Sequence, residues 1–218
     1  MLNERKFAFI ICANNDMFLK ECMAYINNIE IPEGYTADVL VVSEAASMCA
    51  GYNEGMEGSD AKYKIYLHQD VMLCNPKILY EVLECFKDPN VGMLGAVGNR
   101  KLQPSANMSD GTRIGLVELC GTTDKSIIGE NPGCITDVEA LDGLLLITQY
   151  DIRWREDIFD GWDFYDLSQC REFMNKGYRV CVPHFDRAWC MHYYGLTLGK
   201  LTKYDHYRQI YQDEYMRE

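Results

Sequence analysis

The sequence predicts an α/β fold with a doubly wound, mostly parallel sheet. Over the first hundred residues, short apolar runs of strand length alternate with segments whose apolar residues recur at helical spacing. Polar residues follow three of the apolar runs at their carboxyl ends, the edge at which open α/β sheets bind ligands. The sequence has no internal repeat or low-complexity tract, so a single domain is the simplest interpretation.

The first strand is expected at 7–13, a continuous apolar run of buried-strand length. Asn14, Asn15 and Asp16 then supply turn and N-cap chemistry. The apolar residues that follow recur at helical spacing, and Pro32 is expected to end this first helix.

The next elements continue the alternation of strand and helix. A second buried strand is expected at 39–42, a short helix at 47–56 and a third strand at 63–67. A helix at 75–86 opens on an asparagine–proline pair, which is typical of an N-cap followed by proline at the first helical position. The apolar run 91–97 predicts a fourth strand.

Regular alternation stops after this strand. Residues 99–136 are rich in Gly, Ser, Thr, Asn and Pro, and long irregular segments of this kind usually serve function. The elements expected in the second half are an apolar island at 114–119, a core segment at 138–148, a helix at 168–176 with Gly177 as its C-cap, a strand at 179–183 and a closing helix from residue 200.

The charge and hydropathy patterns exclude several classes of protein. The chain has 21 Lys and Arg against 33 Asp and Glu, a formal net charge of −12. Such a surface repels nucleic-acid phosphates, and no basic stripe offsets it. No apolar stretch is long enough to span a membrane, and the N-terminal run lacks a signal-peptide cleavage site.

Ten cysteines are scattered singly along the chain, with no Cys-x-x-Cys pair. Most lie inside apolar runs, where a reduced cysteine behaves as a small hydrophobe. We therefore expect buried free thiols in a cytoplasmic protein, and no zinc site built from cysteine.

The candidate site lies where three polar groups follow three strands. These groups are 14–16, Ser43-Glu44 and His68-Gln69-Asp70. The carboxyl ends of parallel strands share one edge, so the groups should form a polar rim around one cleft. Asp70 is suited to hold a hard divalent cation that bridges phosphate oxygens, and the alternative is that it caps the following turn.

Five segments carry a resemblance to a known family. In chain order they are the Asn53-Glu54-Gly55 turn, the strand ending in His68-Gln69-Asp70, the stretch Ala140–Leu146, the block Phe159–Leu167 and the strand entry Gly177–Pro183. Their order and content resemble a family 2 type glycosyltransferase with the GT-A fold, and are most similar to a small bacterial branch of glycosyltransferase-like proteins. The resemblance covers most of residues 7–195.

This resemblance implies a Rossmann-like GT-A sheet and a function. Residues 1–98 would form a nucleotide-binding half, 99–199 an acceptor half and 200–218 a C-terminal helix. The implied reaction is metal-assisted transfer of a hexose, with inversion favoured, from a nucleotide-diphosphate sugar, UDP-sugars being favoured. The acceptor would be a hydroxyl of a glycan, a lipid-linked acceptor or a cell-surface polysaccharide precursor. Mn²⁺ or Mg²⁺ is the implied cofactor, and a homodimer is allowed.

The resemblance also assigns residues to the site. The nucleotide-sugar side comprises Asn14, Asn15, Glu44, Asn53, His68, Gln69 and Asp70, with His68 on the uracil or ribose side. Asp70 and His192 are the expected metal ligands, and Asp142, Gly143 and Trp162 lie on the acceptor side. The family's Asp-x-Asp motif reads His68-Gln69-Asp70 here, so its first carboxylate is missing.

Catalysis needs a base that takes the proton of the acceptor hydroxyl. Asp163 and Asp166 are the candidates, and we expect one to be the base while the other caps the helix or holds the acceptor. His192 has an equally plain alternative, a partly buried histidine packed among aromatic residues. Trp154, Trp162, Tyr193 and Tyr194 can stack on a sugar or base, or belong to the core.

Two other functions stay open from the sequence. The incomplete Asp-x-Asp motif is consistent with a catalytically inactive GT-A domain that binds a nucleotide sugar or glycan, and a dispersed polar rim would favour a partner-binding module. A dinucleotide oxidoreductase is disfavoured, because the glycines at 92, 95 and 98 have the wrong spacing and follow the wrong strand.

Overall fold

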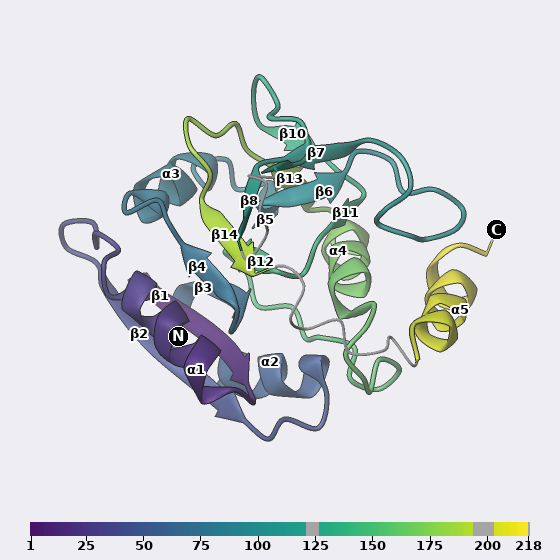
Figure 1. The fold of residues 1–218 in the computed structure, drawn as a ribbon, viewed down its shortest axis with the longest axis horizontal. Helices are drawn as coiled ribbons and strands as arrows, with labels where there is room; N and C mark the ends of the chain where they lie inside the picture. The colour runs from purple at the N-terminus through teal and green to yellow at the C-terminus, as the bar shows by residue number, and fades with distance from the viewer. Residues whose placement is uncertain (121–126, 194–202, 218) are drawn as a thin grey trace.

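The computed structural model describes residues 1–120, 127–193 and 203–217. Its largest sheet has seven strands in the order β10-β13-β5-β12-β3-β1-β2 (Figure 1). These strands are β1 (Asn3–Ala13), β2 (Thr36–Ser43), β3 (Ala61–His68), β5 (Val91–Gly95), β10 (Thr136–Asp137), β12 (Leu145–Thr148) and β13 (Arg179–Val182).

Two smaller sheets and the helices complete the described fold. One small sheet contains β11 (Ala140–Leu141), β6 (Val97–Asn99) and β7 (Arg113–Gly115). The other contains β4 (Val71–Leu73), β14 (Cys190–Tyr193), β8 (Val117–Cys120) and β9 (Ile127–Ile128). The helices are α1 (Asp16–Ile26), α2 (Met48–Glu57), α3 (Ile78–Cys85), α4 (Tyr165–Asn175) and α5 (Tyr204–Tyr215).

The predicted α/β fold with a mostly parallel sheet is confirmed, with one reversed strand near the middle, β12, and another at one edge, β10, which is antiparallel to β13. β1 runs parallel to β2 and β3, and β13 runs parallel to β5. β12 lies between β3 and β5 and is antiparallel to both, with Ile147 opposite Ile65 and Leu94. The sheet therefore joins strands from both halves of the chain.

The expectation of a fully buried strand at 39–42 is wrong. β2 is the last strand of the sheet, and only one of its faces packs on α2. Val39 and Val41 on the other face are 36% and 39% exposed, while Val42 is buried. A continuous apolar run predicts a strand but does not tell a central strand from an edge strand.

Several boundaries differ from the prediction for local reasons. α1 ends at Ile26, well before Pro32. The helix expected from 75 begins at Ile78, because the Asn75 side chain accepts a hydrogen bond from the Lys77 N–H in a preceding turn. The single strand expected at 91–97 divides into β5 and β6.

Two glycines let α2 pack closely on β1. A Cβ atom at Gly55 would lie 2.3 Å from Ile10 Cγ2, and one at Gly51 would lie 2.4 Å from Cys12 Sγ. The segment Asn53-Glu54-Gly55 is thus part of α2 and not the turn that the sequence suggested. The close approach fixes α2 against the carboxyl half of β1.

Beneath the carboxyl end of β3 lies an aromatic cluster formed by Tyr52, Tyr66, Trp154 and Tyr165. The ring centroids of Tyr52 and Trp154 are 4.9 Å apart, and those of Tyr66 and Trp154 are 5.0 Å apart. All four side chains are buried, Trp154 to 1% exposure. The cluster gives the candidate site a rigid apolar floor.

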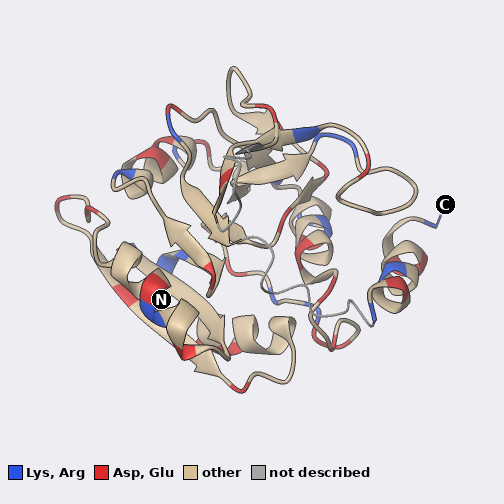
Figure 2. Cartoon of the chain, in the orientation of Figure 1, with Lys and Arg blue, Asp and Glu red and all other residues tan. Residues whose placement is uncertain are grey.

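In the view of Figure 2, Lys and Arg are interspersed with Asp and Glu along helices such as α1, α4 and α5. Ion pairs such as Arg155–Glu214 and Arg179–Asp88 join charged side chains that are distant in the sequence. No helix within the described residues is both long and apolar enough to cross a bilayer.

Lys64 lies in the middle of the sheet and is completely buried. Its ammonium group donates to Asp151 at 2.7 and 2.9 Å and to the carbonyl oxygen of Ala61 at 2.7 Å. A buried charge of this kind needs its partner, because desolvation is otherwise uncompensated.

We expect Asp151→Asn to lower the free energy of unfolding by about 3 kcal/mol, because it leaves a buried ammonium without its counter-charge. The matched control is Glu84→Gln, which removes one partner of the exposed Lys87–Glu84 pair. That change should cost at most about 0.5 kcal/mol. Urea unfolding of both variants checks the prediction, and equal losses would contradict it.

Candidate active site

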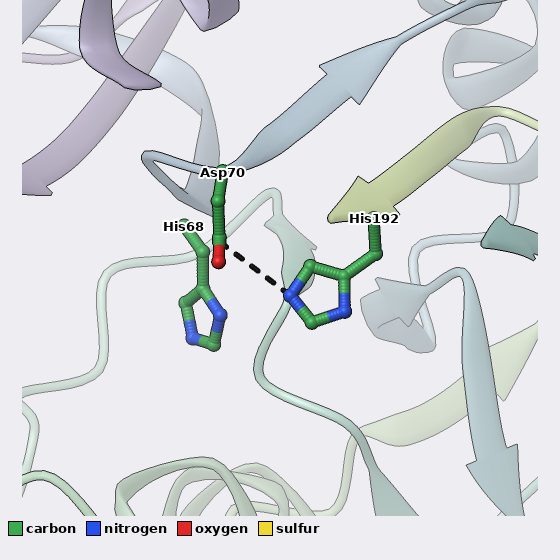
Figure 3. A group of neighbouring side chains, drawn as sticks. All are labelled: His68, Asp70 and His192. Carbon is green, nitrogen blue, oxygen red and sulfur yellow. Dashed lines mark ion pairs between the residues drawn. The ribbon is translucent and has the colours of Figure 1, made fainter. Parts of the chain in front are cut away.

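His68, Asp70 and His192 come together at the carboxyl end of β3 (Figure 3). β3 ends at His68, and a short turn carries the chain to Asp70 and β4. β14 pairs antiparallel with β4 so that His192 lies opposite Val71, and the Tyr193 N–H donates to the Asp70 carbonyl at 3.1 Å. One ligand atom from each of the three side chains lies within 4.8 Å of the others.

Asp70 and His192 form the charged part of this triad. His192 Nε2 is 3.5 Å from Asp70 Oδ1, and Asp70 is only 6% exposed. Burial by itself would lower the pKa of His192, but the hydrogen bond and charge of Asp70 outweigh it and raise this pKa above its ordinary value. Burial would likewise raise the pKa of Asp70, but the hydrogen bond and charge of His192 hold it below the usual range.

His68 is held from the opposite side of its ring. Its Nε2 forms a hydrogen bond with the hydroxyl of Tyr165, the first residue of α4. Burial is the main influence on the pKa of His68 and lowers it, which favours the neutral imidazole that binds metals. The sequence placed His68 beside the nucleotide, whereas the structure groups it with the expected ligands Asp70 and His192.

The donor set fits a divalent metal. Two imidazole nitrogens and one carboxylate are a donor set that divalent first-row metal ions accept. A spread of up to 4.8 Å between ligand atoms is slightly wider than bonds of about 2.1 Å to one ion allow, so small rotations of the side chains would complete the site. Three protein ligands leave open positions for a substrate.

Two further carboxylates border the triad. Asp142 follows β11, and its Oδ1 accepts from the Leu144 N–H at 3.2 Å. Asp166 accepts from the N–H groups of Gly143 and Leu167, both at 2.9 Å. Burial first, and then the charge of Asp142, raise the pKa of Asp166 to about 7. A carboxylate with this pKa is suited to exchange a proton near neutrality.

The expectation that Asp163 or Asp166 caps the following helix is wrong. α4 begins at Tyr165, three residues before the predicted start, and its N-cap is Phe164 with φ of +62° and no side-chain cap bond. Asp166 therefore lies inside the first turn, and Asp163 lies before the cap. Burial raises the pKa of Asp163. Trp162, next to it, is 50% exposed.

Gln69 ties together the loops that follow β1 and β3. Its Oε1 accepts from the N–H groups of Asn14 and Asn15 at 3.0 and 2.8 Å, and its Nε2 donates to Asn14 Oδ1 at 2.7 Å. The Asn15 side chain caps α1 by accepting from Met17 N–H at 3.0 Å. The hydrogen bonds among these amides hold the two loops of the rim together. The helix cap predicted at Asn15 is confirmed.

Glu44 and Asn53 differ in their access to this rim. Glu44 is exposed at the carboxyl end of β2, with a positive φ of 57° that is uncommon outside glycine. Asn53 is buried, and both atoms of its amide bond to the backbone of Trp154, at 3.0 and 2.9 Å. The direct contact with a nucleotide expected for Asn53 is therefore not supported, because its side chain anchors the segment at Trp154.

The aromatic residues that were candidates for stacking on a sugar or base also differ in their positions. Trp154 is a core residue, and Tyr193 packs against Phe18 with ring centroids 5.4 Å apart. Tyr194 lies outside the described residues. Sequence reasoning gave no role to Tyr165, and its position directly before Asp166 was the only local signal that it faces the site.

A family model described as "Glycosyltransferase like family" matches residues 8–215. None of the curated proteins matches the chain.

Solved structures resemble the chain at low sequence identity. TarS 1–349 of S. aureus gives a TM-score of 0.59 at 10% identity, over 86% of this chain and 60% of that one. The mannosyltransferase PcManGT of Pyrobaculum calidifontis, in complex with GDP-Man and Mn²⁺, gives 0.52 at 12% identity, over 85% and 58%. GalNAc-T7 with UDP, GalNAc and Mn²⁺ gives 0.60 at 10% identity, over 89% and 45%.

These likenesses confirm the predicted GT-A fold. The chain spans about three-fifths or less of the length of these structures.

The raised pKa of Asp166 predicts a pH dependence of stability. Below about pH 4 this carboxyl is protonated in the folded and the unfolded states, so it does not penalise folding. Between about pH 4 and 7 the unfolded chain ionises first, so stability falls as pH rises and levels off above the folded pKa of about 7.

Asp166→Asn removes this titration. Relative to the wild type, its free energy of unfolding should increase by on the order of 2 kcal/mol between pH 5 and pH 8. Urea unfolding at both pH values measures the change, with Asp186→Asn, which alters a carboxylate 93% exposed, as the control. A constant difference between Asp166→Asn and the wild type at both pH values would show that the group does not titrate in this range.

Proposed function

Because the chain belongs to this glycosyltransferase-like family, we propose that it transfers a sugar from a nucleotide-diphosphate sugar to an acceptor hydroxyl. The observation that supports this most strongly is the arrangement at the carboxyl end of β3. A metal-binding triad lies there beside a carboxylate with a pKa of about 7. A metal ion held by the triad would stabilise a departing diphosphate, and the carboxylate can accept the proton of an attacking hydroxyl.

We propose a UDP-hexose as the donor. TarS 1–349 has been solved with UDP and with UDP-GlcNAc, and the mannosyltransferase with GDP-Man and Mn²⁺. In this chain Asp70, Asp142 and Asp166 surround the site with carboxylates, which repel a diphosphate unless a cation lies between them. The negative charge of the site thus favours a donor that binds together with a metal.

His68, Asp70 and His192 would hold the metal, and their two imidazoles favour Mn²⁺ over Mg²⁺. When bound, such an ion stabilises the negative charge that develops on the departing nucleotide diphosphate. Gln69, Asn14 and Asn15 keep the two loops of the rim at a fixed separation. Exposed Glu44 is available to contact the nucleoside.

We assign Asp166 as the general base. Its pKa of about 7 lets it accept the proton of an acceptor hydroxyl, and the N–H groups of Gly143 and Leu167 hold the carboxylate in one orientation. A single base on the acceptor side is consistent with direct displacement and inversion at the anomeric carbon. Asp163 then remains as a contact for the acceptor.

The acceptor would be a glycan or a lipid-linked sugar. Trp162, with half of its surface exposed beside Asp163, provides a face on which a sugar ring can stack. Asp142 and Gly143 border the same side through the Gly143–Asp166 hydrogen bond.

We also propose that the protein works in a reducing compartment such as the cytoplasm. All ten cysteines lie in the described part of the chain and are free. Burial raises the pKa of several of them, Cys12 and Cys22 to about 12, so they remain thiols.

The alternative of an inactive binding domain rested on the missing first carboxylate of the Asp-x-Asp motif. His68 replaces that carboxylate with an imidazole that lies within the same group of metal ligands. The substitution therefore changes the ligand type without removing a ligand, and the inactive alternative is not favoured.

Nucleotide binding should depend on the metal through Asp70. We expect isothermal titration with UDP and Mn²⁺ to show affinity at least about tenfold weaker in EDTA or in Asp70→Asn, because loss of the bridging ion leaves carboxylates facing phosphates. Glu84→Gln on α3 removes an exposed carboxylate and serves as the control. Equal UDP affinity with and without the metal would rule out the metal-bridged site.

Turnover should separate the two aspartates. Asp166→Asn should reduce kcat by about 10²-fold or more while leaving donor affinity nearly unchanged, because the base acts only in the transition state. Asp163→Asn should mainly raise the KM for the acceptor. Sugar transfer or donor hydrolysis, screened with UDP- and GDP-sugars, measures both effects.

The kcat/KM of the wild type should also rise with pH up to about 7, as the base loses its proton. Full activity of Asp166→Asn would place the base elsewhere, with Asp142 as the next candidate. A wild type that is inactive with every donor tested would overturn the proposed function.

A further inference from the structure

We propose that Tyr165 is a positioning residue: its hydroxyl holds the His68 ring so that Nδ1 faces the metal site formed with Asp70 and His192. This inference rests on the proposed function. It assigns Tyr165 no contact with the metal or the substrate.

The first observation is the contact itself. Tyr165 Oη lies in hydrogen-bond contact with His68 Nε2, and Tyr165 is only 4% exposed. Its ring packs in the aromatic floor, with centroids 5.9 Å from Tyr52 and 6.2 Å from Trp154. The hydroxyl is therefore a fixed partner and not a mobile surface group.

The second observation is which ring nitrogen remains available. In neutral histidine one nitrogen carries the proton and the other has the lone pair that binds a metal. In the proposed arrangement Nε2–H donates to Tyr165 Oη, which leaves the lone pair of Nδ1 for the ion. Figure 3 shows one nitrogen of His68 on the side of the ring toward His192. A hydrogen bond to the second nitrogen fixes the tautomer and orientation of a metal-binding histidine.

The third observation is the space that Tyr165 occupies. A Cβ atom at Gly143 would lie 2.1 Å from Tyr165 Oη, so the hydroxyl reaches His68 only because residue 143 is a glycine. The N–H of the same glycine donates to Asp166. Two consecutive residues of α4 thus engage Gly143, and they couple the orientation of a metal ligand to the position of the proposed base.

The same aromatic cluster contains a residue, Tyr52, that serves as a control for a purely structural role of Tyr165. Tyr52 is buried, its ring neighbours that of Tyr165, and its hydroxyl has no hydrogen-bond partner among the residues that the structure describes. Tyr165→Phe and Tyr52→Phe each remove one buried hydroxyl and keep the ring. Only the first removes a contact with His68.

The experiment measures binding of Mn²⁺ alone by isothermal titration, together with the melting temperature of each variant. Tyr165→Phe should bind Mn²⁺ about tenfold more weakly than the wild type, while Tyr52→Phe should stay within about twofold. Gly143→Ala should weaken Mn²⁺ binding as Tyr165→Phe does, because the added methyl group displaces the hydroxyl. Equal Mn²⁺ affinity in Tyr165→Phe and the wild type would overturn the proposal.

A second measurement needs no variant. In the wild type loaded with diamagnetic Zn²⁺, ¹⁵N spectra of His68 should show the proton on Nε2, and a proton on Nδ1 would overturn the proposal.

Failure of the proposed function would give a different set of binding results from failure of the positioning role. If the wild type binds neither Mn²⁺ nor a nucleotide, the metal site and the positioning role both fall. If it binds Mn²⁺ and loses it in Asp70→Asn, while Tyr165→Phe is unaffected, only the positioning role falls.

Discussion

The antiparallel pairing of β4 with β14 is the constraint on which the candidate site depends. It places His192, from the second half of the chain, beside Asp70 from the first half. Without this register the third candidate ligand would be missing, and the buried carboxylate of Asp70 would lose the largest contribution that lowers its pKa. The site is therefore a product of the tertiary fold, although each of its residues follows a short local segment.

The sequence predicted most of this architecture because its main signals are local. Strand-length apolar runs and helix caps such as Asn15 located the elements, and the position of Asp70 after a strand located the site. The exposed edge of β2 and the early start of α4 could not be predicted, because both depend on neighbours distant in the chain. The entry of His68 into the metal group also needed the position of β14, which no local pattern encodes.

Electrostatics and packing act together around the site. Its carboxylates, Asp70, Asp142 and Asp166, lie close enough to influence one another or the same histidines, and the aromatic floor limits their hydration. His192 lies beside Asp70 and lowers its pKa below the ordinary range. Asp166 accepts hydrogen bonds from backbone N–H groups, but burial and the charge of Asp142 outweigh them and raise its pKa. One fold thus favours the ionised form of one carboxyl and the protonated form of another at the same edge of the sheet.

α5 packs against the segment that directly precedes α4. Tyr207 donates to Asp160 at 2.6 Å and leaves no room for a side chain at Gly161, while Tyr204 and Tyr211 pack on Phe164. The segment that bears Trp162 and Asp163 is thus held by α5. Under the proposed assignment of these two residues to the acceptor, substitutions in α5 would alter the choice of acceptor and leave the rim at the carboxyl end of β3 in place.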